Sequence, residues 1–442
     1  MSKLYCQLPR KSTKVDPTPG PHARARLAVL LASGGRFRCD CCPMRVVLVS
    51  EYYYPDVGGI PEHLHHLGRH LARRGHQVTI LTTCFPGLEG VPVPADPALE
   101  VIRLGRSSRP VLTNGSVSRA AVGLGLGRQV RALLAARRFD VIHVHGPLFP
   151  VLPLLAIRHA PPASALVATL HTHFGGSAIM RLLRPLLQRY LDVLDGIVAV
   201  SASAAASLHR LGFRFCAQIV PNGVDLAYWS SGQRLPWVGD DIPTILIQAR
   251  LEPRNRVELV LAALGRLPSG TARLILVGDG PCRGALQAAV PPGHRQAVHF
   301  VGTQIARRPD YARSADIYCF TADMASHPMS LLEGMAAGLP VVCQDVAGVR
   351  ELVRPEREGL IVPLGDVEAW AQALARLARD PLLRRQMGEA ARQRAAAFAW
   401  PILAERVEAI YVASMEARAR RCAGDESARG CGAIRRHPDR GT

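Results

Sequence analysis

The stretch at residues 44–82, MRVVLVSEYYYPDVGGIPEHLHHLGRHLARRGHQVTILT, decides the fold. An apolar run predicts a strand over Arg45–Ser50, and a loop rich in Tyr and Gly follows it. Leucines at helical spacing then predict a helix over Pro61–Arg74, which Gly75 ends. A second apolar run predicts a strand over Val78–Thr82. A strand, a helix and a strand in this order indicate a parallel sheet.

The same alternation continues along the chain in two series joined near residues 225–240. The first series has further strands at Val101–Leu104, Val141–Val144, Ala165–Leu170 and Gly196–Val200, with helices over Gly125–Arg137 and Ala178–Leu194. The second has strands at Thr244–Gln248, Leu274–Gly278, Val298–Val301, Ile317–Cys319, Val341–Cys343 and Leu360–Val362. This pattern predicts an α/β protein with two doubly wound, Rossmann-like domains that face a cleft.

We place the first domain at 44–225 and the second at 241–400, followed by a helix at 401–421. Residues 1–43 and 422–442 lack sustained periodicity and are predicted to be irregular tails. Because Met44 opens a clean strand, one interpretation is that it is the native start and that 1–43 is upstream sequence.

Cysteine usage favours a reducing compartment. Six of the eleven Cys lie in the tails, and the five others are far apart in apolar contexts: Cys84, Cys216, Cys282, Cys319 and Cys343. We interpret these five as buried, reduced thiols of a cytoplasmic protein. No apolar run is long enough to span a bilayer, and no secretory signal is evident.

The chain carries a net charge of +19. Every Lys lies in the first tail, so the basic residues between the two tails are Arg and His. A basic core suits phosphate-bearing ligands and anionic membrane surfaces. Nucleic acid is ranked low, because aromatic residues make up only 5% of the chain and no nucleic-acid-binding motif is present.

The segment at 325–342, ASHPMSLLEGMAAGLPVV, predicts a short helix over Met329–Ala337 that leads into a buried strand. Glu333 lies in this helix. One interpretation is a solvated residue favoured by the helix dipole. The other is a helix N-terminus facing the negative part of a nucleotide, with Glu333 as a ligand.

Two loops at strand ends carry further candidate residues. Gly58 and Gly59 permit close approach of the backbone to a ligand, although a plain turn would use them too. His171 and His173 follow a predicted strand at its carboxyl end, where α/β folds bind ligands. A His-x-His pair can bind metal, but no acidic or Cys partner is evident, so no metal site is predicted.

Together these motifs resemble the family 4 retaining glycosyltransferases. The resemblance covers about residues 44–415 and includes PNGVD at 221–225, VGDGP at 277–281 and SADIYC at 314–319. It implies two Rossmann-like halves of the GT-B type, a nucleotide-sugar donor, no cofactor and no metal needed for the chemistry. In the donor site it implies roles for Gly59, Arg250, Arg254, Asn255, Met329 and Glu333. Arg250 and Arg254 would hold the diphosphate and Glu333 the ribose, while His171 would contact the transferred sugar.

The acceptor prediction rests on a shorter match. Residues 114–119, Asn114-Gly115-Ser116-Val117-Ser118-Arg119, resemble the acceptor loop of bacterial phosphatidyl-myo-inositol mannosyltransferases, where the Arg meets the lipid phosphate. Tyr52 lies in the first loop and is added as a polyol contact. The resemblance therefore implies transfer of a hexose, mannose from GDP-mannose, to a phosphatidylinositol-type lipid or another lipid or glycan acceptor.

Three positions depart from the family pattern. Ala325 stands where the family has a Glu that contacts the sugar, Asn255 stands at a Lys position, and Pro328 removes a backbone N–H. Two alternatives therefore stay open: a catalytically impaired relative that acts as a binding or partner subunit, and a transferase that uses UDP-N-acetylglucosamine.

A lipid acceptor requires contact with a membrane. The helices at Gly125–Arg138 and Ile179–Leu194 combine several Arg with apolar residues, a pattern that can lie on anionic lipid. A solvated face over a core-packed stripe explains each helix equally well. The localisation predicted is cytoplasmic, with peripheral contact at the inner face of the membrane.

Overall fold

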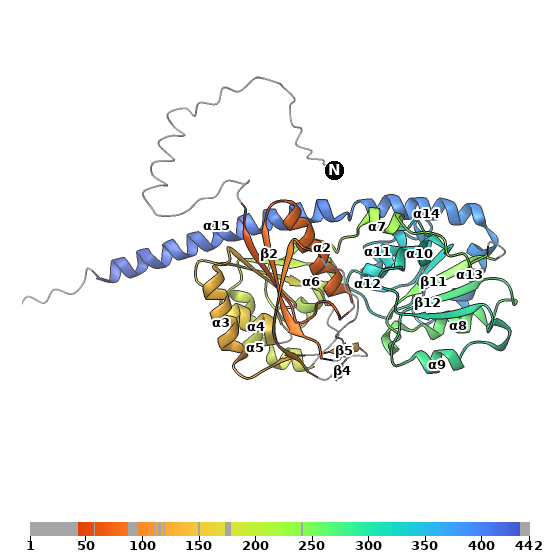
Figure 1. Cartoon of the computed structure of the whole chain (residues 1–442), viewed down its shortest axis with the longest axis horizontal. Helices are drawn as coiled ribbons and strands as arrows, with labels where there is room; N and C mark the ends of the chain where they lie inside the picture. The colour runs from red at the N-terminus through yellow and green to blue at the C-terminus, as the bar shows by residue number, and fades with distance from the viewer. Residues whose placement is uncertain are drawn as a thin grey trace, which may run out of the picture. The chain divides into compact units, whose positions relative to one another are not determined.

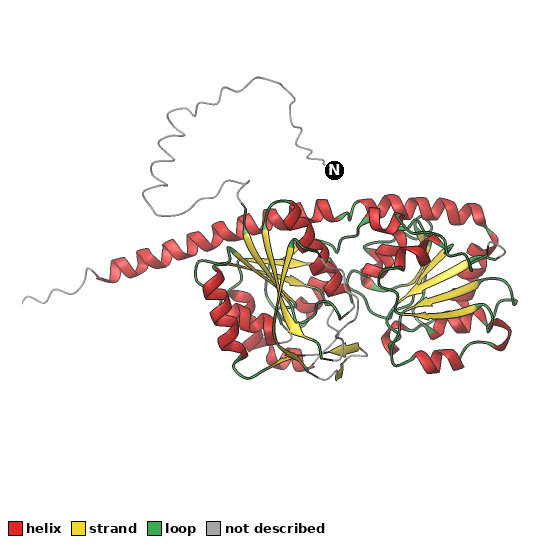
Figure 2. Ribbon diagram, viewed as in Figure 1, coloured by secondary structure: helices red, strands yellow, loops and turns green. Residues whose placement is uncertain are grey.

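The computed structural model describes residues 43–56, 58–86, 96–108, 111–113, 116–118, 120–148, 151–172, 178–239 and 242–433. The predicted tail at 1–43 lies outside these residues apart from Pro43. Two extended sheets organise the rest, each with helices on both faces (Figures 1 and 2). We call the part built on the larger sheet the first half and the part built on the smaller sheet the second half.

The first half has the strand order β10-β9-β8-β7-β1-β2-β3-β6, parallel except for the β3–β6 pair. Its strands are β1 (Arg45–Val49), β2 (Gln77–Cys84), β3 (Leu99–Ser107), β6 (Ala121–Val122), β7 (Val141–His145), β8 (Ala165–Leu170), β9 (Gly196–Ala199) and β10 (Gln218–Ile219). Its helices are α2 (Gly59–Arg73), α3 (Leu126–Arg137), α4 (Val151–Arg158), α5 (Ala178–Asp192) and α6 (Ala202–Arg210). A separate antiparallel pair joins β4 (Val111–Thr113) to β5 (Ser116–Ser118).

The second half has the all-parallel order β13-β12-β11-β14-β15-β16. Its strands are β11 (Thr244–Gln248), β12 (Arg273–Val277), β13 (Val298–Gly302), β14 (Ile317–Phe320), β15 (Val341–Gln344) and β16 (Gly359–Val362). The helical segments are α7 (Leu226–Ser230), η1 (Pro253–Asn255), α8 (Glu258–Leu264), α9 (Arg283–Ala288), η2 (Pro292–His294), α10 (Arg308–Arg313), α11 (Met329–Ala336), α12 (Ala347–Arg350), α13 (Val367–Arg379) and α14 (Pro381–Ala396).

Each sheet reverses its winding direction once. In the first half this point lies between β1 and β7, and in the second half between β11 and β14. Doubly wound sheets bind ligands beside the carboxyl ends of such strands. The loops after β1, β7, β11 and β14 are therefore where a site is expected, and the candidate residues are found in or next to these loops.

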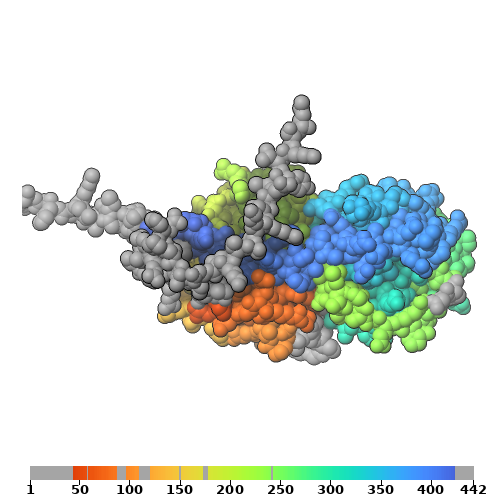
Figure 3. Space-filling model, turned by 90° about the horizontal axis from the view of Figure 1, so that it is seen from above, coloured from red at the N-terminus to blue at the C-terminus, as the bar shows by residue number. Residues whose placement is uncertain are grey.

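The last helix, α15 (Trp400–Ala433), returns to the first half. Leu403, Val407 and Tyr411 share a buried apolar cluster with residues of β1 and α2. Figure 3 shows the dark blue residues of α15 next to the red and orange ones of the first half. The predicted crossing helix is thus present. It also extends beyond the predicted end at residue 421 to Ala433, so an irregular tail from 422 is wrong over its first part. Ala and Arg, which favour helix, are frequent over 413–423.

The prediction of five buried thiols is only partly correct. Cys319 and Cys343 are buried in the second sheet, Cys84 and Cys282 are partly exposed, and Cys216 is exposed. Cys216 lies between α6 and β10. Its neighbours Phe215 and Ala217 pack partly against the core, whereas Cys216 is on the solvent side. Among the described residues, no helix combines the length and apolar content needed to cross a bilayer.

Candidate active site

A cluster of histidines lies at the winding reversal of the first sheet. His143 and His145 come from β7, His171 follows β8, and His63 is on α2. The rings of His63 and His171 are 4.7 Å apart between centroids, and His145 Nδ1 lies 2.9 Å from His171 Nε2. The sequence thus placed His171 at a strand end, and the fold surrounds it with three further imidazoles.

Burial keeps these imidazoles neutral. It lowers the pKa of His63 to about 4 and that of His143 to about 3, and it holds the pKa values of His145 and His171 well below the usual range. Neighbouring imidazoles in the cluster act in the same direction. At pH 7 the cluster therefore carries no positive charge and contributes lone pairs and N–H groups instead.

One hydrogen-bond relay fixes the protonation of His63. The amide of Asn222 donates through Nδ2 to the carbonyl oxygen of His327 at 2.7 Å, so Oδ1 points toward His63. This oxygen only accepts, and it lies 2.9 Å from His63 Nδ1. His63 Nδ1 therefore carries the proton and Nε2 carries the lone pair.

The second half supplies two cations at the carboxyl end of β11. Arg250 and Arg254 lie in the loop that ends in η1. Burial lowers the pKa of Arg254, and the nearby charge of Arg250 lowers it further. Glu252, which lies 3.5 Å from Arg250, and Asp323 oppose this lowering. Two neighbouring guanidinium groups at a strand end suit an anion such as a diphosphate.

Asn255 supports this loop from within. Its Nδ2 donates to the carbonyl oxygen of Arg250 at 2.6 Å, and its own carbonyl accepts from the hydroxyl of Thr321. The structure thus gives the residue at the family's Lys position a supporting role for Arg250. The next residue, Arg256, donates to Glu258 at 2.6 Å.

Glu333 lies in α11 and is 6% exposed. Arg308 of α10 donates to it at 3.3 Å and also donates to Glu62 of α2 at 2.7 Å. Burial would raise the pKa of Glu62, but Arg308 and His66 bring it down to about 2. Burial raises the pKa of Glu333, which shares its cation with Glu62. The three residues connect the two halves at the predicted ribose contact.

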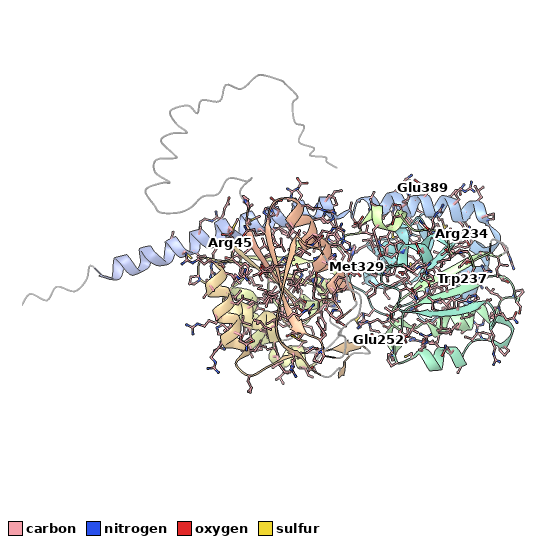
Figure 4. The ribbon with its side chains drawn as sticks, in the orientation of Figure 1. Arg45, Arg234, Trp237, Glu252, Met329 and Glu389 are labelled. Carbon is pink, nitrogen blue, oxygen red and sulfur yellow. The ribbon has the colours of Figure 1, made fainter. Side chains whose placement is uncertain are left out.

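Gly59 and Met329 also meet at this junction. A Cβ added to Gly59 would lie 3.8 Å from the sulfur of Met329, which packs at the start of α11. Figure 4 shows Met329 and Glu252 on the side of the second half that faces the first. The predicted donor residues of α2, α11 and the β11 loop thus lie along one junction.

The structure describes only some of the residues predicted to bind the acceptor. Asn114, Gly115 and Arg119 lie outside the described residues, and Ser116 is described only as part of the backbone of β5. Tyr52 is partly exposed, whereas Tyr53 and Tyr54 are buried. Of the three tyrosines, Tyr52 is therefore the one whose ring remains accessible.

The segment that departs from the family pattern is tightly packed. The carbonyl oxygen of Ala325 accepts from Gly348 N at 3.2 Å, and a Cβ on Gly348 would lie only 2.5 Å from that oxygen. His327 is buried, and both its ring nitrogens lack a partner among the described residues. Burial lowers the pKa of His327 to about 3.

Sequence reasoning missed four residues of this junction: His63, His145, Arg308 and Gln248. His63 and His145 are distant from His171 in sequence, so spacing alone does not bring them to it. Arg308 stands in an ordinary basic segment, so no local signal marks it. Gln248 is a polar residue at the end of an apolar strand, and this signal was available. Its amide is buried without a partner among the described residues.

Solved structures match both halves together. Sucrose-phosphate synthase from Thermosynechococcus elongatus aligns with a TM-score of 0.66 at 21% identity, covering 83% of this chain and 98% of that one. WaaG, a glycosyltransferase involved in lipopolysaccharide biosynthesis, aligns with a TM-score of 0.64 at 19% identity, covering 83% and 99%. The fold is therefore that of the GT-B glycosyltransferases.

Sequence comparison agrees with the fold. Residues 57–228 match the family described as Glycosyltransferase Family 4, and residues 242–380 match Glycosyl transferases group 1. Phosphatidyl-myo-inositol mannosyltransferase of Mycolicibacterium smegmatis is 30% identical over 375 residues, covering 83% of this chain and 93% of the relative. A GDP-mannose-dependent alpha-mannosyltransferase of Mycobacterium tuberculosis is 27% identical, covering 84% and 97%. The chain belongs to the family 4 glycosyltransferases, and it is a transferase enzyme.

Proposed function

We propose that this enzyme transfers mannose from GDP-mannose to a phosphatidylinositol-type lipid, with retention of configuration. The observation that carries the proposal is the pair of neighbouring arginines in the β11 loop of the second half. The histidine cluster at the strand ends of the first half supports it. The donor is proposed from the relatives named as mannosyltransferases, and the acceptor from the relative named for phosphatidyl-myo-inositol.

Departure of the diphosphate is the step that the arginine pair assists. As the bond between sugar and phosphate breaks, negative charge grows on the leaving oxygen, and fixed cations lower the barrier. Arg250 and Arg254 supply these cations. Asn255 holds the Arg250 carbonyl, so it positions the loop without adding charge. No cofactor and no metal enter this step.

His171 contacts the transferred sugar in this proposal. Because burial keeps its imidazole neutral, it can donate or accept a hydrogen bond to a sugar hydroxyl without placing a positive charge beside the reacting carbon. Glu333 accepts from the ribose hydroxyls. Since Arg308 already holds Glu333 in place, the carboxylate is oriented before the donor arrives.

Contact with anionic membrane is proposed from two surface features. On α5, Ile179, Leu182 and Leu186 are 64%, 79% and 54% exposed, and arginines flank them. Arg128 and Arg131 of α3 line a pocket with Arg158. An apolar stripe beside basic groups fits the headgroup region of anionic lipid. Leu182→Asp should weaken flotation with phosphatidylglycerol vesicles, whereas Leu382→Asp, at an exposed leucine of α14, should not.

Calorimetric titration of the full chain tests the donor. We expect GDP-mannose to bind and UDP-glucose and UDP-N-acetylglucosamine not to bind, with GDP alone retaining part of the affinity. Binding of UDP-N-acetylglucosamine instead would replace the donor. Once a donor binds, transfer to phosphatidylinositol is measured, and a lack of transfer would overturn the acceptor.

Restoring the family residues tests whether the altered site is active as it stands. We expect Ala325→Glu combined with Asn255→Lys to give no gain in transfer, because Asn255 supports Arg250 and Ala325 lies in a packed turn. A large gain from an inactive wild type would instead indicate a decayed donor site.

A further inference from the structure

His63, His145 and His171 come from α2, β7 and the loop after β8. One ring nitrogen of each lies within 4.8 Å of the corresponding atoms of the other two. We propose that these three imidazoles form a binding site for a divalent transition-metal ion of the Zn²⁺ class, and that the bound ion inhibits sugar transfer. The inhibition rests on the proposed function, whereas ion binding does not.

The hydrogen bonds around His63 match those of a metal ligand. Metal-binding histidines usually donate their other ring N–H to an oxygen, which fixes the tautomer. His63 donates through Nδ1 to Asn222 Oδ1, so Nε2 retains its lone pair. Asn222 is itself held by the carbonyl of His327, and this relay orients the ring before any ion arrives.

His145 and His171 already share one proton between facing ring nitrogens. Their Nδ1 and Nε2 atoms are 2.9 Å apart, so one of the two nitrogens carries the proton between them. A metal ion can replace this proton and accept both lone pairs. Tetrahedral zinc with Zn–N bonds of about 2.0–2.1 Å places its nitrogen ligands roughly 3.4 Å apart. One pair of the three ring nitrogens is 2.9 Å apart and all lie within 4.8 Å, so the rings would move toward this spacing when the ion binds.

A purely structural cluster would satisfy its polar atoms. His143 does so, because Tyr411 and Thr169 engage its two ring nitrogens at 2.8 and 2.7 Å. His145 does not, since its Nε2 is buried without a partner among the described residues. His145 Nδ1 faces the ring nitrogen of His171, so hydrogen bonds to the surrounding packing do not fix both nitrogens of His145 as they do for His143.

The ligand set determines the class of ion. Three imidazoles and no carboxylate suit zinc, cobalt, nickel or copper, whereas magnesium and calcium require oxygen ligands. Three protein ligands leave a fourth position of zinc open to water. The ion would occupy His171, so this side chain could no longer contact the sugar, and transfer would fall as the ion binds.

Cobalt titration of the full chain tests ion binding without any assay of transfer. We expect one Co²⁺ per chain, with the intense visible bands of a tetrahedral ion and no sulfur-to-cobalt charge-transfer band. That charge-transfer band would report Cys39, Cys41 and Cys42 of the first tail. The proposal would be overturned if no tetrahedral bands appeared. It would also be overturned if the charge-transfer band appeared and no spectrum of cobalt bound by imidazoles alone accompanied it.

Matched variants assign the ligands. His63→Gln and His145→Gln should each weaken Co²⁺ binding at least tenfold, as loss of a ligand does more than the 10- to 100-fold effect of outer-shell changes. His66→Gln, one turn along α2 and outside the cluster, should keep the wild-type affinity. Unchanged affinity in both test variants would contradict the site, and the wild-type spectrum still decides if a variant does not fold.

Zn²⁺ added to the transfer assay tests the inhibition. We expect transfer to fall with the same midpoint that displaces Co²⁺ from the protein, and to recover on addition of a chelator. Tetrahedral cobalt bands without inhibition would support ion binding and overturn the proposed inhibition of transfer. An enzyme with cobalt bands but no transfer of any sugar would instead contradict the proposed function.

Discussion

At the scale of single residues, Glu51 has an unfavourable position for a charge. It follows β1, is 2% exposed, and accepts from the backbone N–H of Leu152 at 2.6 Å. Burial raises its pKa to about 7, although backbone donors oppose the shift. The folded protein therefore binds a proton between pH 4.5 and 7 that the unfolded chain has already released.

This proton makes stability depend on pH. Because the folded pKa is raised, the contribution of Glu51 is fully present below about pH 4.5 and is lost as the pH rises toward 7. The shift corresponds to at most about 3 kcal/mol. Glu51→Gln should remove this slope and stabilise the protein at pH 8, as measured by urea unfolding. Glu100→Gln, at an exposed carboxylate, serves as the control, and an unchanged slope in Glu51→Gln would contradict the assignment.

Gln248 presents the opposite case, a neutral amide with no hydrogen-bond partner in the part of the chain that the structure describes. Its amide is buried at the end of β11, two residues before Arg250. An unpaired buried amide costs about 1–3 kcal/mol, so Gln248→Met should raise the free energy of unfolding by about 1 kcal/mol. The same variant should weaken donor binding in calorimetry, because this strand carries the arginine loop. Gln372→Met, on an exposed face of α13, should change neither quantity.

At the scale of elements, the loop around η1 holds a strained residue. Arg256 caps this segment with φ of 46° and ψ of 35°, the left-handed region that favours glycine. Arg256→Gly should therefore stabilise the protein by about 0.5–1 kcal/mol, since its exposed ion pair with Glu258 contributes little. Arg256→Ala keeps the Cβ and should give no gain. A stabilised alanine variant would show that the side chain, not the backbone, causes the effect.

Most strands were predictable because buried parallel strands are apolar runs of nearly fixed length. The predicted Ala165–Leu170 and Thr244–Gln248 agree with β8 and β11 to the residue. The short strands β6 and β10 were not predicted, because two-residue pairings leave no periodicity in the sequence. The length of α15 was underestimated, since the last part of this helix lacks the apolar stripe that marks a packed face.

The candidate site was predictable where a strand end or a loop carries the residue, as with His171 and Arg250. It was not predictable where the partner comes from another part of the chain. His63 is more than a hundred residues from His171, and Arg308 meets Glu62 across the two halves. Such contacts depend on the tertiary arrangement, and local sequence contains no signal for them.

At the scale of the whole molecule, one link between the halves is a buried charge chain. Arg308 is 16% exposed, lies between Glu62 and Glu333, and stacks over Trp229 at 5.4 Å. One guanidinium thus serves two carboxylates of different halves. Burial opposes its charge, but Glu333 and Glu62 raise the pKa of Arg308, so it stays charged throughout the accessible pH range.

Removing this guanidinium should allow the two halves to unfold in separate transitions. Arg308→Met leaves two buried carboxylates without a cation, a change that costs about 3–5 kcal/mol when one partner of a buried pair is lost. Because Glu62 belongs to the first half and Glu333 to the second, we expect calorimetric unfolding to split into two transitions. Arg307→Met removes a neighbouring arginine that is 57% exposed and should change stability by no more than about 0.5 kcal/mol. A single, unshifted transition in Arg308→Met would mean that the apolar contacts of α15 with the first half, and not the charge chain, couple the two halves.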